Sequence, residues 1–228
     1  MQEYQSIIEI IALSMGVAWA SGINLYAVLL VLGIGGATGN IALPENLEVL
    51  ANPMVIGAAG LMYLVEFGVD KTPGADSVWD GLHSFIRLPA GALLAGGMVG
   101  EVEPAMMLAA AIVGGGVSAT SHFSKASTRL LINTSPEPVS NWTASLTEDI
   151  AVLGGLWLAL NHPLVFLAAL VVFVGLAIWL LPKMWRLILQ LFERLKNFLS
   201  GNRETPQDNS IEPPTTLDPN LLADRNSR

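Results

Sequence analysis

Ionisable and amide side chains recur within stretches of this sequence that are otherwise apolar, and these residues could do chemistry. A charged side chain at the centre of a membrane helix costs roughly 2.5–3.5 kcal/mol on insertion scales, so such residues inside a helical bundle are candidates for a functional site. We expect the acids and the cations to pair across the two halves of the chain and to line one polar cavity. The candidate binding residues are Asn24, Glu66, Asp70, Lys71, Asp76, Asp80, His83, Arg87, His122, Lys125, Arg129, Glu148 and Asp149.

Several of these candidates share one face of a predicted helix in the first half of the chain. Asp76 is a good candidate for the N-cap residue, and Asp80, His83 and Arg87 then follow at i, i+3 and i+7 spacing. One interpretation is an amphipathic helix whose polar face meets water. The other is a helix that contributes a charged wall to a cavity.

Two groups of carboxylates each allow two interpretations. Glu66, followed within about one turn by Asp70 and Lys71, is either a carboxylate at a helix end near the lipid headgroups or a proton or cation site. Glu148 and Asp149 are either carboxylates at a helix N-terminus, where the helix dipole favours negative charge, or partners for the cations of the preceding segment.

The second half of the chain carries a cationic stripe directly after an apolar run. His122, Lys125 and Arg129 again have i, i+3 and i+7 spacing. The hydroxyl residues beside them are Ser121, Ser124, Ser127 and Thr128. The stripe is either the positively charged cytoplasmic flank of a membrane helix or a face that binds an anion or a lipid headgroup.

A break in the first apolar region makes Asn24 a candidate. Residues 7–20 and 25–37 are apolar, but neither segment reaches the ~20 residues that a straight crossing needs. Between them, Ser21, Gly22 and Asn24 place small and polar residues at membrane depth. We weigh one continuous helix with a packing seam of small residues against a broken or re-entrant pair, which is tolerated only where it is buried in protein or lines water.

Composition indicates a membrane protein. The 228 residues are 52% hydrophobic and 13% charged, with a mean hydropathy of +0.55, whereas soluble domains carry roughly 25% charge. The formal net charge of −8 disfavours nucleic acid as a partner. Because the chain has no cysteine and its three histidines are scattered, we expect no disulfide, no metal site and no cofactor.

The apolar runs predict an all-α fold, a polytopic transmembrane helical bundle with short and interrupted helices over residues 6–182. The runs are Met54–Phe67, Leu88–Gly100, Pro104–Val117, Ile150–Leu160 and Leu164–Leu181. The last run is the strongest transmembrane candidate, and it follows a break at Asn161-His162-Pro163. The sequence Glu-Val-Glu at 101–103 suggests a wet turn between two short helices, with glycines on both sides that would let helix backbones approach closely.

The ends of the chain differ from its middle. No Lys/Arg-rich region precedes the first apolar run, so we expect no removable signal peptide. Residues 183–200 have the basic, amphipathic pattern of an interfacial helix, and residues 201–228 are polar enough to be disordered. The positive-inside rule predicts a cytoplasmic carboxyl terminus, and the expected location is the inner (plasma) membrane of a bacterium.

The two halves of the chain resemble each other weakly. Ala20-Ser-Gly resembles Ala119-Thr-Ser after an apolar run, and Asn52-Pro53 resembles His162-Pro163 before a long span. This suggests two pseudo-symmetric repeats, as in many transport folds. The alternative is chance similarity between apolar helices of restricted composition.

Longer motifs carry a family resemblance over about residues 6–182. They are the runs ASGINLYA from Ala20, VEFGVDKTPGADSVWD from Val65, IRLPAGAL from Ile86 and NTSPEPVSN from Asn133, together with the pair Glu148-Asp149. The chain resembles the DUF4126 family of integral membrane proteins. This resemblance implies a membrane location and no established activity. One departure is Leu88, where the family favours proline, which leaves Pro89 to make a turn.

Two classes of function remain open. The leading hypothesis is a channel or carrier for a small solute or ion, embedded in the lipid bilayer, without enzymatic activity and with homo-oligomers as a further expectation. Interrupted helices and flanking polar residues favour it. The alternatives are a membrane scaffold or assembly factor that holds partners through the basic helix, or a lipid-modifying enzyme that uses His83 or His122 with a nearby carboxylate.

Overall fold

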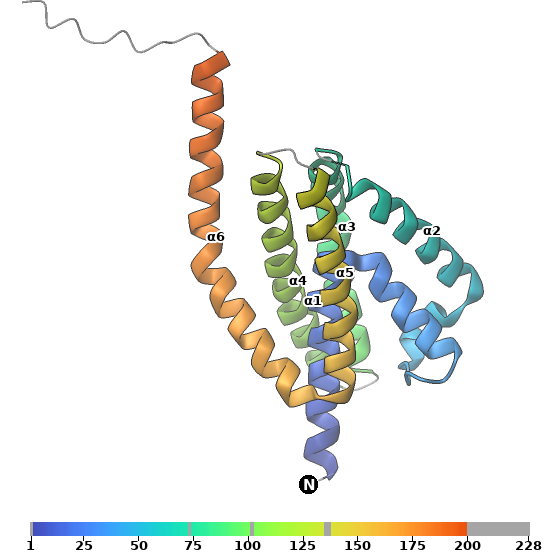
Figure 1. The fold of residues 1–228 in the computed structure, drawn as a ribbon. Coiled ribbons are helices and arrows are strands. Elements are labelled where there is room, and N and C mark those ends of the chain that lie inside the picture. The colour runs from blue at the N-terminus through green and yellow to red at the C-terminus, as the bar shows by residue number, and fades with distance from the viewer. Residues whose placement is uncertain (1, 73, 101–102, 135–137, 200–228) are drawn as a thin grey trace, which may run out of the picture. The chain divides into compact units, whose positions relative to one another are not determined.

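The computed structural model describes residues 2–72, 74–100, 103–134 and 138–199, whose regular secondary structure is entirely helical. The elements are α1 (Gln2–Ala37), the short 3-10 helix η1 (Glu45–Ala51), α2 (Pro53–Val69), α3 (Ala75–Met98), α4 (Pro104–Ile132), α5 (Pro138–Asn161) and α6 (Pro163–Leu199) (Figure 1). The chain divides into two units, Met1–Gln190 and Leu191–Arg228. All features discussed below lie in the first unit, and the predicted polar tail 201–228 lies outside the described residues.

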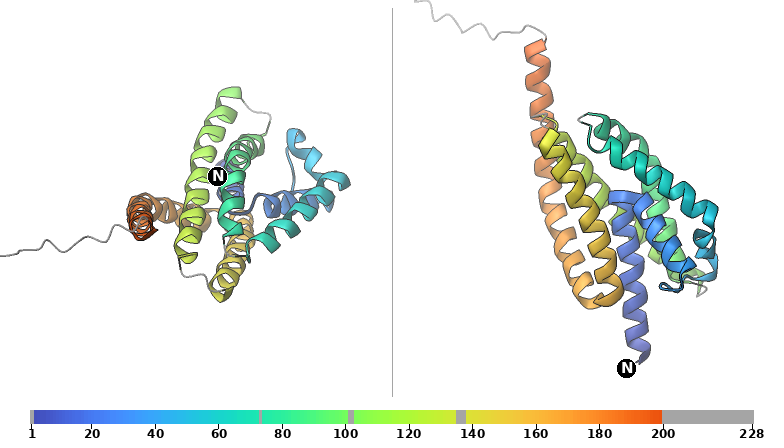
Figure 2. Two further views of the ribbon diagram at one scale, coloured as in Figure 1. Left: turned by 90° about the horizontal axis from the view of Figure 1, so that it is seen from above. Right: turned by 45° about the vertical axis from the view of Figure 1, so that its right-hand side comes forward.

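Helix α1 is broken at Asn24, as one of the two interpretations of the first apolar region predicts. Asn24 has φ −145° and ψ 93°, which is an extended rather than a helical conformation. Figures 1 and 2 show the first part of α1 rising through the bundle and the second part turning back toward the end from which α1 started. The first apolar region is therefore a broken pair of helices.

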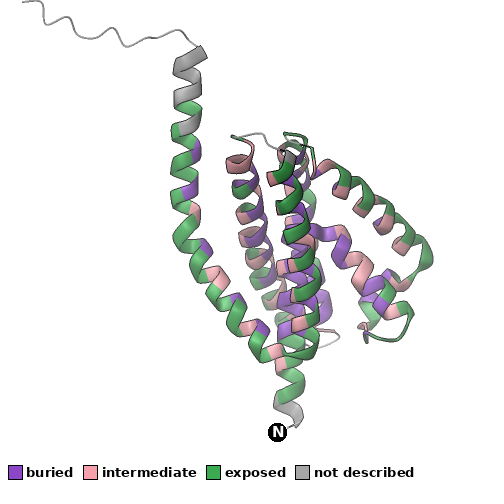
Figure 3. Ribbon diagram, in the orientation of Figure 1, coloured by how far each residue is buried: buried purple, intermediate pink, exposed green. Residues whose placement is uncertain are grey.

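The helices bury their polar faces and expose their apolar ones. Helix α3 turns Asp76, Asp80 and Arg87 inward, whereas Phe85 and Leu93 on its other side are 85% and 73% exposed. In Figure 3, buried residues lie along the facing sides of the helices and exposed residues along the outer sides. Water would penalise such a large apolar surface, and hydrocarbon solvates it. The protein is therefore a multi-pass membrane protein.

Four of the described helical segments are long and apolar enough to cross a membrane. They are Gln5–Ala37, Pro104–Ile132, Val139–Asn161 and Pro163–Gln190, the last having the highest hydropathy, as the sequence predicts. Helices η1 and α2, bent by 65°, would form a fifth span if they cross together. Helix α1 is the most deeply buried of the four and packs against α2, α3, α4 and α5. The predicted internal repeat stays a prediction.

Helices α3 and α4 are longer than the apolar runs predict. Each joins a polar half to an apolar half, so the two helices on either side of residues 101–103 are longer than the short helices expected there. Pro89 lies inside α3 and makes no turn, which corrects the prediction drawn from Leu88. The glycines act as predicted: a Cβ atom on Gly96 would lie 3.0 Å from the Met107 carbonyl oxygen. Small residues thus bring α3 and α4 into close contact.

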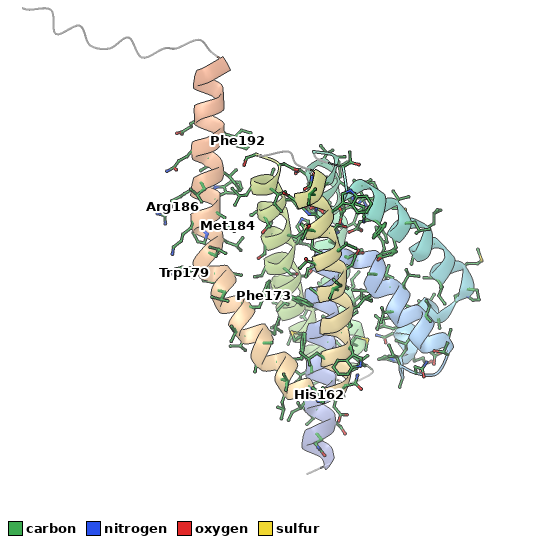
Figure 4. The ribbon with its side chains drawn as sticks, viewed as in Figure 1. His162, Phe173, Trp179, Met184, Arg186 and Phe192 are labelled. Atoms are coloured by element: carbon green, nitrogen blue, oxygen red, sulfur yellow. The ribbon has the colours of Figure 1, made fainter. Side chains whose placement is uncertain are left out.

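Helix α6 continues through Pro182, so the predicted basic segment 183–200 begins as its continuation. Figure 4 shows Phe173 on the side of α6 that faces α4, and Trp179 and Arg186 on the opposite side. A pocket of about 200 Å³ between α4 and α6 includes Phe173 and Met184 in its lining, whereas Trp179 and Arg186 are exposed. A position of this segment at the membrane surface stays a prediction.

Candidate functional site

The centre of the candidate site is Arg87 on α3, which binds two carboxylates at once. Its Nη2 atom donates to Glu66 Oε1 of α2, and its Nη1 atom donates to Asp80 Oδ1, about two turns earlier on α3, both at 2.6 Å. None of the three side chains is more than 1% exposed. Glu66 is thus not a headgroup carboxylate, and the α3 face does not meet water.

Lys125 of α4 connects this centre to two further acids. Its Nζ atom lies 2.9 Å from Asp70 Oδ2 and 3.4 Å from both Glu66 Oε1 and Glu148 Oε2. Asp80 Oδ1 is 3.7 Å away. One ammonium group therefore faces carboxylates from α2, α3 and α5, which is the cross-chain pairing that the sequence predicts.

Arg129 lies about one turn further along α4 and binds Glu148 through two hydrogen bonds. Its Nε and Nη2 atoms donate to Glu148 Oε1 at 3.0 Å and to Oε2 at 2.7 Å. Its Nη1 atom donates to the carbonyl oxygens of Asp70 and Asn141. Such a planar pair with two hydrogen bonds fixes the relative orientation of the guanidinium and carboxylate groups and also neutralises their charges. Glu148 lies mid-helix in α5, so the interpretation of Glu148 and Asp149 as N-terminal carboxylates is wrong.

The break in α1 lies next to these cations. The Ile23 carbonyl oxygen, at the end of the first half-helix, accepts a hydrogen bond from Lys125 Nζ at 3.1 Å. Asn24 Oδ1 caps the second half-helix by accepting from the Ala27 backbone N–H, and Asn24 Nδ2 donates to Asp149 Oδ1 at 3.2 Å. A cation thus meets a helix C-terminal carbonyl, as the helix dipole favours.

The two candidate histidines lie beside the network and are held by neutral partners. His83 stacks on Trp79 with ring centroids 4.0 Å apart, and its Nε2 lies 3.2 Å from the Tyr26 hydroxyl. His122 Nε2 lies 2.6 Å from Ser84 Oγ. The expected stripe of three cations therefore has two cations, Lys125 and Arg129, in ion pairs.

Asp76 lies at the edge of the network and is not the N-cap of α3, because Gly74 holds that position. Its Oδ1 atom accepts from the Ser77 backbone N–H at 2.7 Å and from Asn133 Nδ2 at 2.8 Å. Arg129 Nη1 is 3.9 Å from Oδ2. Asp76 is fully buried and ties the start of α3 to the end of α4.

Lys71 follows α2 and lies outside the ion pairs described above. Its Nζ atom donates to the Phe67 carbonyl oxygen at 3.0 Å and contacts Ser145 Oγ at 3.3 Å, and it also lies over the Phe67 ring. Burial lowers the pKa of the Lys71 ammonium, and the nearby charge of Asp149 opposes that effect.

An open cleft of about 590 Å³ between α4 and α5 reaches the network. Its floor includes Lys125 and Glu148, and Ile23 from the break in α1 also lines it. Its hydroxyl groups come from Ser121, Ser124 and Thr128 of α4 and from Ser140, Thr143 and Thr147 of α5. The walls between these groups are apolar. This arrangement suits a ligand pocket, which is mostly apolar with a few convergent polar groups.

The sequence did not single out several neutral residues that complete the site. Ser84, Ser145, Asn133 and Asn141 each hydrogen-bond a candidate residue or link two of them. The only feature of the sequence that could have identified them is their spacing, which places each polar residue on the same face of a predicted helix as a charged candidate. Within the described parts of the chain, no group of three acidic or histidine side chains has an arrangement that could hold a metal ion.

The fold and the site define a class of protein: a multi-pass helical membrane protein with an ion-pair network inside its bundle. The sequence model of the family described as domain of unknown function (DUF4126) matches residues 11–183, and the chain belongs to this family. No curated protein and no solved structure matches the chain.

Proposed function

We propose that this protein moves a small solute or an ion across the membrane, with the cleft between α4 and α5 as the entry to its binding site. The observation that carries the proposal is the position of Lys125. Its ammonium group binds the free carbonyl oxygen at the break in α1 and also forms part of the cleft floor. Broken helices whose backbone meets charged groups are a recurring element of transport sites.

The cleft offers hydrogen-bond acceptors and two opposite charges to a bound molecule. The hydroxyl groups of Ser124 and Thr147 donate to carbonyl oxygens of their own helices, which leaves oxygen lone pairs free for a ligand. Lys125 and Glu148 add a cation and a carboxylate at the floor. A small polar solute or a hydrated ion fits these groups. The proposed binding residues are the network residues together with Asn24 and Asp149.

The alternative functions find less support in the described residues. The short contact between Ser84 and His122 resembles a nucleophile and its base. Neither residue lines the cleft, so a lipid substrate entering there would not meet them. A scaffold that holds its partners through the basic helix would not explain the buried ion-pair network.

The location and assembly of the protein are part of the same proposal. Lys183 and Arg186 begin a basic segment after the most hydrophobic span, which supports a cytoplasmic carboxyl terminus in an inner (plasma) membrane. Exposed apolar side chains on every span support the lipid bilayer as the main partner. A homo-oligomer could cover part of the same surface.

Flux through reconstituted vesicles tests the proposal. Vesicles containing the protein are assayed for glycerol, urea, glycine, sodium, potassium and chloride. We expect flux of at least one of these above that of protein-free vesicles. Thr147→Trp, which fills the cleft, should remove most of this flux, whereas Leu146→Trp, on the adjacent exposed residue outside the cleft lining, should leave it unchanged. Folded wild-type protein that passes none of these probes would overturn the proposal.

A further inference from the structure

The network contains two more carboxylates than cations. Nine ion pairs of 4.0 Å or less join the described residues Arg87, Lys125 and Arg129 to Glu66, Asp70, Asp76, Asp80 and Glu148. Uncompensated charge is costly in a buried site, and carboxylates in such surroundings are neutralised by protonation. Neutralising all five carboxylates therefore requires further positive charge, such as bound protons, in addition to the three cationic side chains.

Four buried carboxylates each have one oxygen with no hydrogen-bond partner. These atoms are Glu66 Oε2, Asp70 Oδ1, Asp76 Oδ2 and Asp80 Oδ2, on residues that are between 0% and 4% exposed. An ionised carboxylate can only accept hydrogen bonds, so an unpartnered oxygen leaves negative charge without compensation. A proton bound to such an oxygen neutralises that charge and, unlike a larger cation, needs no cavity of its own.

The shortest contacts show which carboxylates are in surplus. Lys125 has Asp70 as its nearest acid, and Arg129 has the two-point pair with Glu148. Asp76 lies in the first turn of α3, where the helix dipole favours negative charge, and accepts two hydrogen bonds.

The surplus therefore falls on Glu66 and Asp80, which share Arg87 at equal distances of 2.6 Å. Two carboxylates whose nearest cation is the same guanidinium group, and whose second cation is the shared Lys125 at 3.4 and 3.7 Å, favour a state in which one of them is protonated.

We propose that the Glu66–Asp80 pair binds a proton, carried on Glu66 Oε2, and that its uptake and release drive the solute or ion movement proposed above. The proton comes from bulk water through the cleft, whose floor residue Lys125 lies 3.4 Å from Glu66 Oε1. This inference rests on the proposed function only for the coupling. Proton binding itself follows from the charges and contacts of the pair.

Other titratable groups surround the pair on every side. Besides Arg87, they are Tyr26 from α1, Tyr63 and Asp70 from α2, His83 from α3, His122 and Lys125 from α4, and Glu148 from α5. A pH titration of function alone would therefore report several groups together. The test must observe the carboxyl group directly.

Infrared spectroscopy of the purified protein observes a protonated carboxyl group through its carbonyl stretch. We expect this band at neutral pH in the wild type and in Glu45→Gln, a control at an exposed acid, and we expect its loss in Glu66→Gln. Asp80→Asn should also remove the band, because Glu66 then has Arg87 to itself and ionises. A wild type without the band, or a band that survives both Glu66→Gln and Asp80→Asn, would overturn the inference.

A flux measurement separates this inference from the proposed function. Vesicles that contain the protein and a trapped pH indicator should acidify or alkalise as the transported probe moves, and Glu66→Gln should abolish the proton movement. Probe flux that proceeds without proton movement and without the infrared band leaves transport standing and refutes proton binding. The band without any flux supports proton binding and refutes transport. Loss of the band when sodium is added would mean that a sodium ion displaces the proton from the pair, and it would overturn the proton as the coupling ion.

Discussion

The buried charge of Arg87 is compensated by two carboxylates, and Arg87 is the nearest cation of both. Glu66 and Asp80 each lie 2.6 Å from a different guanidinium nitrogen, and all three side chains are buried. Replacing a buried ionic group by an apolar residue leaves its partners as uncompensated charges. We therefore expect Arg87 to contribute more to stability than an exposed cation such as Arg186.

Arg87→Met is expected to lower the free energy of unfolding by about 3–5 kcal/mol, because it removes the shortest ion pair of both Glu66 and Asp80 and leaves them only the longer contacts to Lys125. Adding Glu66→Gln and Asp80→Asn to Arg87→Met should restore much of that loss. Denaturation of the purified variants in detergent micelles measures the effect. Arg186→Met, at an exposed residue of α6, is the control and should change stability little. A triple variant no more stable than Arg87→Met would argue against the paired arrangement.

The sequence indicates these residues but not their partners. The spacing of Asp80 and Arg87 places both on one helix face, and this face is buried as a charged wall. No sequence pattern says that Glu66 approaches from α2 or Glu148 from α5, because such contacts depend on how the helices are arranged in space. The neutral partners Ser84 and Asn133 are missed for the same reason.

At the scale of elements, some polar residues that the sequence places at helix ends lie inside long helices, as Glu148 and Asp149 do in α5. Helices α3, α4 and α5 each join a polar half to an apolar half without a break. A composition-based division ends a span where hydropathy falls, but here the polar residues face the bundle and need no turn. The break at Asn24 was an open alternative because Ser21, Gly22 and Asn24 interrupt an apolar run.

Gly22 allows α1 to approach α4 closely just before the break. A Cβ atom at this position would collide with Ser121 Oγ and with the Ser118 carbonyl oxygen. Gly22→Ala is therefore expected to destabilise the protein by about 1–3 kcal/mol, as overpacking does in close-packed interiors. Thermal unfolding in detergent measures the change. The control is Gly175→Ala, where a Cβ atom meets nothing within 4 Å. Equal stability of the two variants would contradict the close approach of α1 and α4.

At the scale of the molecule, the distribution of side chains is reversed relative to a soluble protein. Large apolar residues such as Phe85 and Leu93 are exposed, whereas Glu66, Arg87 and Arg129 are fully buried. Hydrocarbon outside the bundle forces charged groups toward one another or toward water. In the proposed function, water reaches them through the cleft between α4 and α5, which Lys125 and Glu148 line. Transport and proton binding both depend on this access.

The central claim, that water fills the cleft while lipid covers the outer faces, is tested most directly by cysteine labelling. The chain has no native cysteine, so Ser124→Cys, Thr147→Cys and Leu153→Cys each introduce a single thiol. In vesicles, a charged, membrane-impermeant thiol reagent should label the two cleft positions and leave Leu153→Cys, an exposed apolar position on α5, unlabelled. Unreactive cleft cysteines, or a Leu153→Cys that reacts as fast as they do, would contradict the account.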